Sequence, residues 1–122
     1  MFRVIIAGTR YFNDYAVLKE YCNYILSNKI RDKEEIIILS GGAKGADTLG
    51  ERYAAEKGFS VISYPAQWEK YGAAAGPKRN KEMCANADAL IAFWDGQSRG
   101  TRNIIEEAKK KGLKVAVKYY NS

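Results

Sequence analysis

The residues with the clearest potential for chemistry are 40–47, which read SGGAKGAD. They directly follow the apolar run 36–39 and directly precede a segment with a helical pattern. Glycines let a backbone approach a ligand closely, and the free N–H groups of a first helical turn attract anions. The spacing matches neither the P-loop nor the G-x-G-x-x-G pattern. The segment therefore predicts a phosphate-binding turn, with a plain strand-to-helix turn as the alternative.

The elements that must position this turn follow from the hydrophobic pattern. Apolar runs rich in β-branched and aromatic residues predict strands at 3–7, 36–39, 61–64, 89–94 and 114–118. Helical patterns lie between them at 15–27, 46–57, 77–85 and 101–111. Asp14 is the expected N-cap of the first helix, and Gly58 and Gly112 are expected to end two others. Such alternation predicts a Rossmann-like, doubly wound α/β fold, with a mainly parallel five-stranded sheet and helices on both faces.

Ligands of such sheets bind at the carboxyl ends of the strands, near the point where the winding reverses. Three loops expected at that edge, 8–10, 40–45 and 95–102, each combine glycine with a hydroxyl group and a cation. We therefore expect them to form one anion site. Its candidate ligand-binding residues are Gly8, Thr9, Arg10, Gly41, Gly42, Ala43, Lys44, Gly45, Asp47, Gly96, Ser98, Gly100 and Thr101.

Composition narrows the function further. The 122 residues fit one domain spanning 1–122, and no apolar run approaches the roughly 20 residues that cross a bilayer, so no membrane partner is expected. The first apolar run suits a buried strand better than a secretory signal, which favours a cytoplasmic protein with Cys22 and Cys84 as reduced thiols. The chain contains no histidine, which excludes Ser-His and Cys-His nucleophile pairs. No catalytic residue and no protein-held metal is assigned.

In this order, the motifs 8–10, 40–47, 75–80 with Met83, and 100–101 resemble the YspA/YpsA-related branch of the SLOG superfamily. Relatives of that branch include the LOG phosphoribohydrolases and the DNA-processing protein A. The resemblance covers essentially the whole chain. It implies binding of a nucleotide or nucleotide-derived ligand, such as ADP-ribose, another NAD-related molecule or a nucleoside monophosphate, and it implies a homodimer.

The resemblance also adds Arg79 and Asn80 to the ligand-binding residues, at the start of the third long helix. No cofactor is assigned with certainty, and magnesium is a candidate ion. Asp47 is open to two interpretations: compensation of the helix dipole, or a hydrogen bond to a ribose hydroxyl. Trp68 and Tyr71 are expected either to stack on a base or to form a hydrophobic lid. Asp95, beside Gly96, is expected to form a turn rather than to hold water or metal.

Two alternative functions stay open. The first is LOG-like hydrolysis of a nucleotide N-glycosidic bond; LOG enzymes place a glutamate three residues after the threonine of their Gly-Thr motif, where this chain has Ile104, while Glu106 and Glu107 are displaced along the helix. The second is a single-stranded DNA-binding module, suggested by the net charge of +6. Much of that charge is a lysine run near the carboxyl end, at 109–111, 114 and 118, which is typical of a solvated surface.

Overall fold

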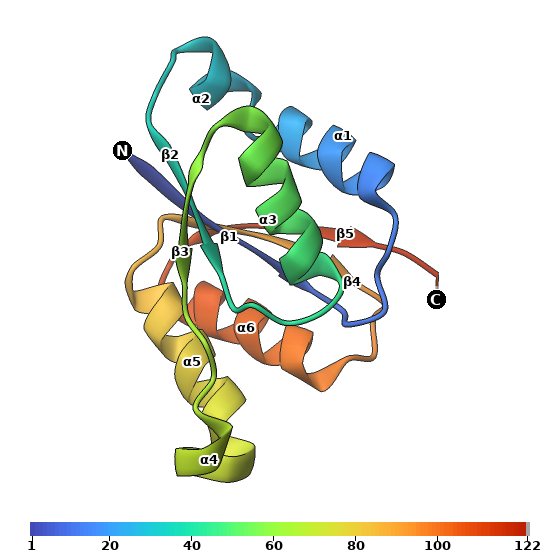
Figure 1. Cartoon of the computed structure of the whole chain (residues 1–122), viewed down its shortest axis with the longest axis vertical. Helices are drawn as coiled ribbons and strands as arrows, with labels where there is room; N and C mark the ends of the chain where they lie inside the picture. Colours follow the sequence, from blue (N-terminus) through green and yellow to red (C-terminus); the bar gives the residue numbers. More distant parts are fainter. Residues whose placement is uncertain (122) are drawn as a thin grey trace.

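The computed structural model describes residues 1–121 and forms one five-stranded sheet (Figure 1). Its strands are β1 (Phe2–Gly8), β2 (Ile36–Ser40), β3 (Ser60–Ser63), β4 (Ala89–Trp94) and β5 (Lys114–Tyr119). They are ordered β3-β2-β1-β4-β5, and every neighbouring pair is parallel. The predicted doubly wound Rossmann-like fold is thus confirmed. The winding reverses between β1 and β4, the two central neighbours that are distant in sequence.

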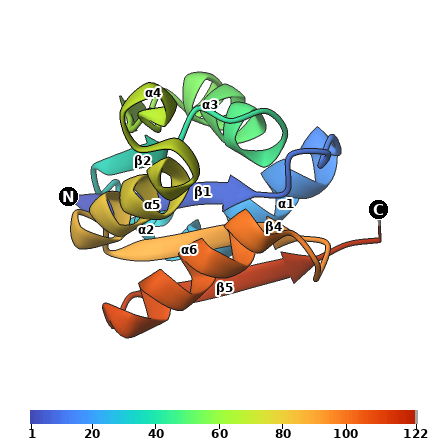
Figure 2. The same ribbon diagram turned by 90° about the horizontal axis from the view of Figure 1, so that it is seen from below.

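Helices cover both faces of the sheet, as Figure 2 shows. They are α1 (Tyr15–Ile25), α2 (Ser27–Arg31), α3 (Ala46–Lys57), α4 (Trp68–Tyr71), the 3-10 turn η1 (Gly72–Ala74), α5 (Ala75–Ala85) and α6 (Arg99–Lys110). Alternate residues of β1 point to opposite faces: Val4 and Ile6 pack against α1 and α3, while Ile5 and Ala7 pack against α5 and α6. The inner strands β1, β2 and β4 are largely buried, which explains their continuous apolar runs, whereas the edge strands β3 and β5 are more exposed.

The three residues predicted to cap helices are confirmed in that role. The Asp14 carboxylate accepts a hydrogen bond from the Val17 amide at the start of α1. Gly58 ends α3 in the left-handed conformation, with φ of 76°, and Gly112 follows α6 with φ of 74°. The first helix ends earlier than expected, since the chain turns at Leu26 and continues as α2.

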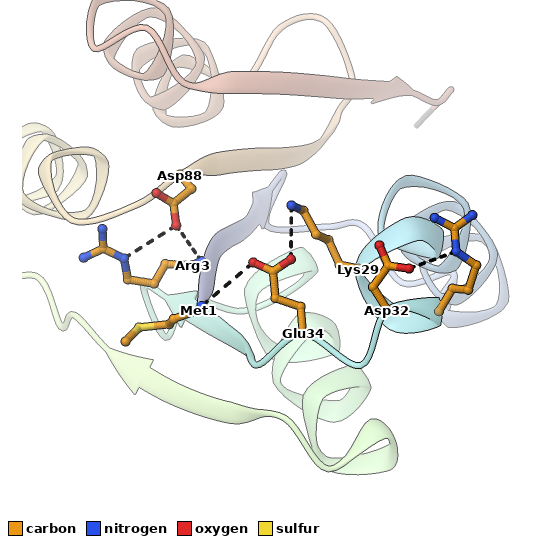
Figure 3. A network of polar contacts seen from close by, with 7 residues as sticks. Met1, Arg3, Lys29, Asp32, Glu34 and Asp88 are labelled. Atoms are coloured by element: carbon orange, nitrogen blue, oxygen red, sulfur yellow. Dashed lines mark hydrogen bonds and ion pairs between the residues drawn. The ribbon is translucent and has the colours of Figure 1, made fainter.

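Polar contacts hold the edge of the sheet opposite to the carboxyl ends of the strands (Figure 3). The Asp88 carboxylate, directly before β4, accepts a hydrogen bond from the backbone amide of Arg3 at 2.8 Å and lies 3.6 Å from its guanidinium. Glu34 pairs with Lys29 and with the amino terminus. Partly exposed ion pairs of this kind contribute only about 0–1 kcal/mol each. The contacts at this edge therefore have an ordinary structural explanation. None of the helices within residues 1–121 is long and apolar enough to cross a membrane.

Candidate functional site

A cleft of about 360 Å³ lies at the carboxyl edge of the sheet, where β1 and β4 end. Its volume falls in the usual range for small-molecule sites. Among the predicted site residues, it is lined by Gly8, Arg10, Ala43, Asp47, Arg79, Asn80, Ser98, Gly100 and Thr101. The others lie outside the lining: Thr9, Gly41, Gly42, Lys44, Gly45 and Gly96. The structure thus brings nine of the fifteen predicted residues to one cavity, with at least one from each of the three loops.

The start of α6 is open toward this cleft. Asp95 turns the chain by accepting hydrogen bonds from the amides of Gln97 and Ser98, at 2.9 and 2.8 Å, which lowers the pKa of its carboxyl group. This confirms the expected turn. The Ser98 side chain makes no capping bond to the helix. Within residues 1–121, the backbone amides of Arg99, Gly100 and Thr101 have no acceptor, so they are available to an anion.

The glycine loop between β2 and α3, in contrast, satisfies much of its own backbone. The amide of Gly42 donates to the Ser40 hydroxyl at 3.1 Å, and that of Ala43 donates to Asp47 at 3.2 Å. The amide of Ala46 donates to the carbonyl oxygen of Thr9 at 3.4 Å. The loop therefore reaches the cleft mainly through Ala43 and Asp47, and less of it is free for phosphate than the sequence alone suggests.

Two of the predicted residues shape the loops rather than line the cleft. Thr9 is buried between β1 and β4, where its hydroxyl accepts a hydrogen bond from the Asp95 amide at 3.2 Å. Gly45 has φ of 81°, and a Cβ atom there would collide with the backbone of Arg10. Only glycine suits that position, because the loops after β1 and β2 touch there.

Arg79 connects three elements at the wall of the cleft. Its Nη1 donates to the carbonyl oxygen of Gly41 at 2.7 Å and to that of Tyr64 at 3.4 Å, which follow β2 and β3. Its Nε donates to Oδ1 of Asn80 at 2.9 Å. A Cβ atom on Gly41 would lie 2.7 Å from Cζ of Arg79, so the glycine makes room for the guanidinium group.

Asp47 is the only carboxylate of the described chain that lines the cleft. Its residue is 5% exposed, and burial raises the pKa of its carboxyl group to about 6. The Ala43 amide and the positive charge of Arg79 act in the opposite direction. A carboxyl group with this pKa changes its charge near neutral pH, a property common among functional groups.

The cleft combines positive charge with an apolar floor. It is lined by three arginines from different parts of the chain, Arg10, Arg79 and Arg99, and their positive charge favours an anionic ligand. Met83 and Ile104 are buried and contribute apolar lining, so the position of the LOG glutamate is occupied by a hydrocarbon side chain. Neither Glu106 nor Glu107 is part of the described lining; Glu106 is exposed, and Glu107 lies 3.8 Å from Lys110.

The aromatic wall comes from the segment before α5. Trp68 lines the cleft and is 59% exposed, and a Cβ atom on Gly76 would lie 3.4 Å from its Cη2. Tyr71 is 38% exposed and lines a separate hollow beside Lys78, whose ammonium lies 4.7 Å from its ring centroid. Of the two aromatic residues singled out from sequence, Trp68 alone lines the cleft.

Sequence reasoning missed Asn103 and Arg99, which both line the cleft. Arg99 is the first residue of α6, which begins two residues earlier than expected. Asn103 follows it by four residues and Gly100 by three, so all three share one helix face. That spacing was the available signal for Asn103.

Comparisons with known proteins agree with this architecture. Residues 2–71 match the family described as "YspA, cpYpsA-related SLOG family". The chain is 37% identical to the gene 61 protein of Mycobacterium phage D29, over 94% of each chain.

Two solved structures share the fold at 20% sequence identity. One is DNA processing protein A (DprA) from Streptococcus pneumoniae, with a TM-score of 0.69 over 95% of this chain. The present chain spans about half of that protein, 49%. The other is the structural-genomics protein TM1055, with a TM-score of 0.66 over 94% of this chain and 72% of that one. The family match over more than half of the sequence and the 37% identical relative show that this chain belongs to the YspA, cpYpsA-related SLOG family.

Proposed function

We propose that the cleft binds a nucleotide or nucleotide-derived ligand, with a phosphate at the N-terminus of α6. The observation that carries the proposal is the open first turn of α6 in a cleft lined by three arginines. Each helix-terminus interaction with an anion contributes roughly 0.3–1 kcal/mol when exposed and about 2 kcal/mol when partly buried. Membership of the family supports a nucleotide-related role.

The other walls fit the remaining parts of such a ligand. The exposed indole of Trp68 offers a face on which a base can stack. Asp47 can accept a hydrogen bond from a ribose hydroxyl or, together with ligand phosphates, hold a magnesium ion. Within residues 1–121, no group of three acidic, histidine or cysteine side chains is placed to hold a metal, so such an ion would arrive with the nucleotide.

Binding is favoured over LOG-like hydrolysis because the cleft presents Ile104 where that reaction needs a carboxylate. A hydrolytic variant of the function would have to rely on Asp47. Product formation from AMP, NAD and ADP-ribose, with and without magnesium, tests that alternative directly.

The substitution Gly100→Asp tests the proposed phosphate site. Gly100 is exposed, it does not have a positive φ, and no atom lies within 4 Å of a Cβ atom built there. An aspartate in the first turn also favours the helix. We therefore expect a folded protein with an unchanged or slightly raised Tm, in which the new charge occupies the phosphate position and reduces binding at least about 100-fold, or roughly 2.7 kcal/mol.

The measurement is calorimetric titration with AMP, ADP, NAD and ADP-ribose. The matched control is Ala16→Asp, which places the same charge at the second residue of α1, a residue that is also exposed and does not line the cleft. Equal affinity of the Gly100→Asp variant and the Ala16→Asp variant for a bound nucleotide would exclude the α6 terminus as its phosphate site.

A further inference from the structure

We propose that Asn103 determines specificity in this cleft by donating its side-chain amide to an oxygen acceptor of the ligand, and that Arg79 and Asn80 fix its orientation. This inference rests on the proposed function and concerns a residue that the sequence analysis did not assign to the site. A series of hydrogen bonds runs from the β2–α3 loop through α5 to α6.

This series contains three hydrogen bonds. Arg79 is held by the carbonyl oxygen of Gly41 at 2.7 Å, and its Nε donates to Oδ1 of Asn80 at 2.9 Å. Nδ2 of Asn80 then donates to Oδ1 of Asn103 at 2.9 Å. Asn80 is 5% exposed, so water does not easily replace either of its partners.

The direction of these bonds follows from the chemistry of the guanidinium group. Arginine has only donors, so the atom of Asn80 that faces it must be the carbonyl oxygen. The amide nitrogen of Asn80 therefore faces Asn103, which must answer with its own oxygen. As a result, Arg79 sets the orientation of the Asn103 side chain through Asn80. This network uses Oδ1 of Asn103 and does not use its Nδ2.

Nδ2 of Asn103 has no hydrogen-bond acceptor among the hydrogen bonds of residues 1–121, and the residue lines the cleft. It lies one helical turn from Arg99 and Gly100, on the face that carries the open amides. A group with two N–H donors beside a phosphate site selects an acceptor, such as a phosphate or carbonyl oxygen, over a ligand amino group. Donors along the α6 face thus select the acceptors of the ligand, and Asp47 is the one carboxylate within residues 1–121 that lines the cleft.

A purely structural role makes a different prediction for the same residues. If Asn103 only ties α6 to α5, then Asn103→Asp is neutral, because a carboxylate still accepts the bond from Asn80. If Asn103 reads the ligand, that variant loses the donors while keeping the internal bond. Asn103→Leu, of similar size and without charge, also loses the donors. Gln97→Glu adds one negative charge at an exposed position of the preceding loop that does not line the cleft, and it serves as the charge control.

Asn80→Asp tests the relay itself. An aspartate there still accepts from Arg79, but it turns an acceptor toward Asn103. Asn103 must then rotate its amide to donate inward, which presents its oxygen to the cleft. The ligand should therefore be lost although Asn103 is unchanged, a result that a tie between helices would not produce, since the two side chains remain hydrogen-bonded.

The experiment is calorimetric titration of the full chain and these variants with AMP, ADP, NAD and ADP-ribose, with Tm recorded for each. We expect the Asn103→Asp, Asn103→Leu and Asn80→Asp variants to bind the nucleotide that the unaltered protein binds at least about ten-fold more weakly. The Gln97→Glu variant should stay within about three-fold, as expected for a screened surface charge.

If the unaltered protein binds and the Asn103→Asp variant matches the Gln97→Glu variant, this inference is overturned and the proposed function stands. If the unaltered protein binds none of the four nucleotides, the proposed function fails, and the inference fails with it. A loss seen for Asn103→Asp but not for Asn103→Leu would assign the effect to charge and would also overturn the donor role.

Discussion

Asp47 is the residue whose charge state most affects this site. Burial raises its pKa from 3.8 to about 6, although the Ala43 amide and Arg79 favour the ionised form. In the unfolded chain the group ionises near 3.8, so between that pH and about 6 the folded state holds the proton that the unfolded state releases. Its contribution to the free energy of unfolding is therefore greatest below this window and falls as pH rises through it.

This linkage predicts the pH dependence of an Asp47→Asn variant. The asparagine keeps an acceptor for Ala43 but does not ionise, so the variant should gain stability relative to the unaltered protein as pH rises from about 4 to 7.5. A shift of about two pKa units corresponds to roughly 3 kcal/mol. Urea unfolding at both pH values measures the change, and the difference between the two proteins cancels the other carboxylates. A difference that does not vary with pH would contradict the raised pKa.

At the scale of the elements, the sequence predicted the strands, the long helices and their order, because each has a local signal. Apolar runs mark the parallel strands, and Asp14, Gly58 and Gly112 mark helix ends. The short α4 and η1 lack such a signal, since Trp68 and Tyr71 are exposed and no periodic apolar face defines them. Their position depends on tertiary contacts with α5.

The location of the candidate site could be predicted from the sequence, but the role of each loop within the site could not. The parallel topology alone places three loops at one edge of the sheet. Whether a backbone group in those loops is free depends in part on partners distant in sequence: the Thr9 carbonyl oxygen accepts a hydrogen bond from the Ala46 amide, and Arg79 donates to the Gly41 carbonyl oxygen. Sequence periodicity does not encode such contacts, which is why the glycine loop appeared more open, and α6 less important, than the structure shows.

Two helical glycines show that the need for glycine also depends on tertiary contacts. Gly50 and Gly100 both lie in helices, yet a Cβ atom on Gly50 would lie 2.7 Å from Cγ2 of the buried Ile6, while one on Gly100 meets nothing within 4 Å. Alanine improves helix propensity by up to about 1 kcal/mol, and overpacking costs about 1–3 kcal/mol.

We therefore expect Gly50→Ala to lower the urea midpoint and Gly100→Ala to maintain or raise it, with similar m-values. A Gly50→Ala variant more stable than the unaltered protein would show that α3 can move away from β1 at little cost. It would also remove the close approach of α3 to the sheet as a reason for glycine there.

At the scale of the whole molecule, which carries a net charge of +6, two groups of positive side chains lie in different regions. Arg10, Arg79 and Arg99 line the cleft, whereas Lys109, Lys110 and Lys111 follow at the other end of α6 and are exposed. The 12 residues of α6 extend roughly 18 Å, about twice the Debye length at physiological salt. The lysine run should therefore have little influence on a small ligand in the cleft. Its substitution can thus distinguish nucleotide binding from nucleic-acid binding.

Replacing Lys109, Lys110 and Lys111 by alanine separates these functions, since it lowers the net charge from +6 to +3 without altering the cleft. At 150 mM salt, the affinity for a bound nucleotide should change less than about two-fold, because the lysines lie beyond the screening length. If a single-stranded oligonucleotide binds through all three lysines, its affinity should fall, and the slope of log K against log salt should become shallower by about 2. Fluorescence anisotropy with a labelled oligonucleotide across a salt series, beside calorimetry with the nucleotide, measures both. An oligonucleotide affinity that survives the lysine substitutions but is lost in the Gly100→Asp variant would place a nucleic-acid end in the cleft itself, and would make the open turn of α6 the phosphate site for both kinds of ligand.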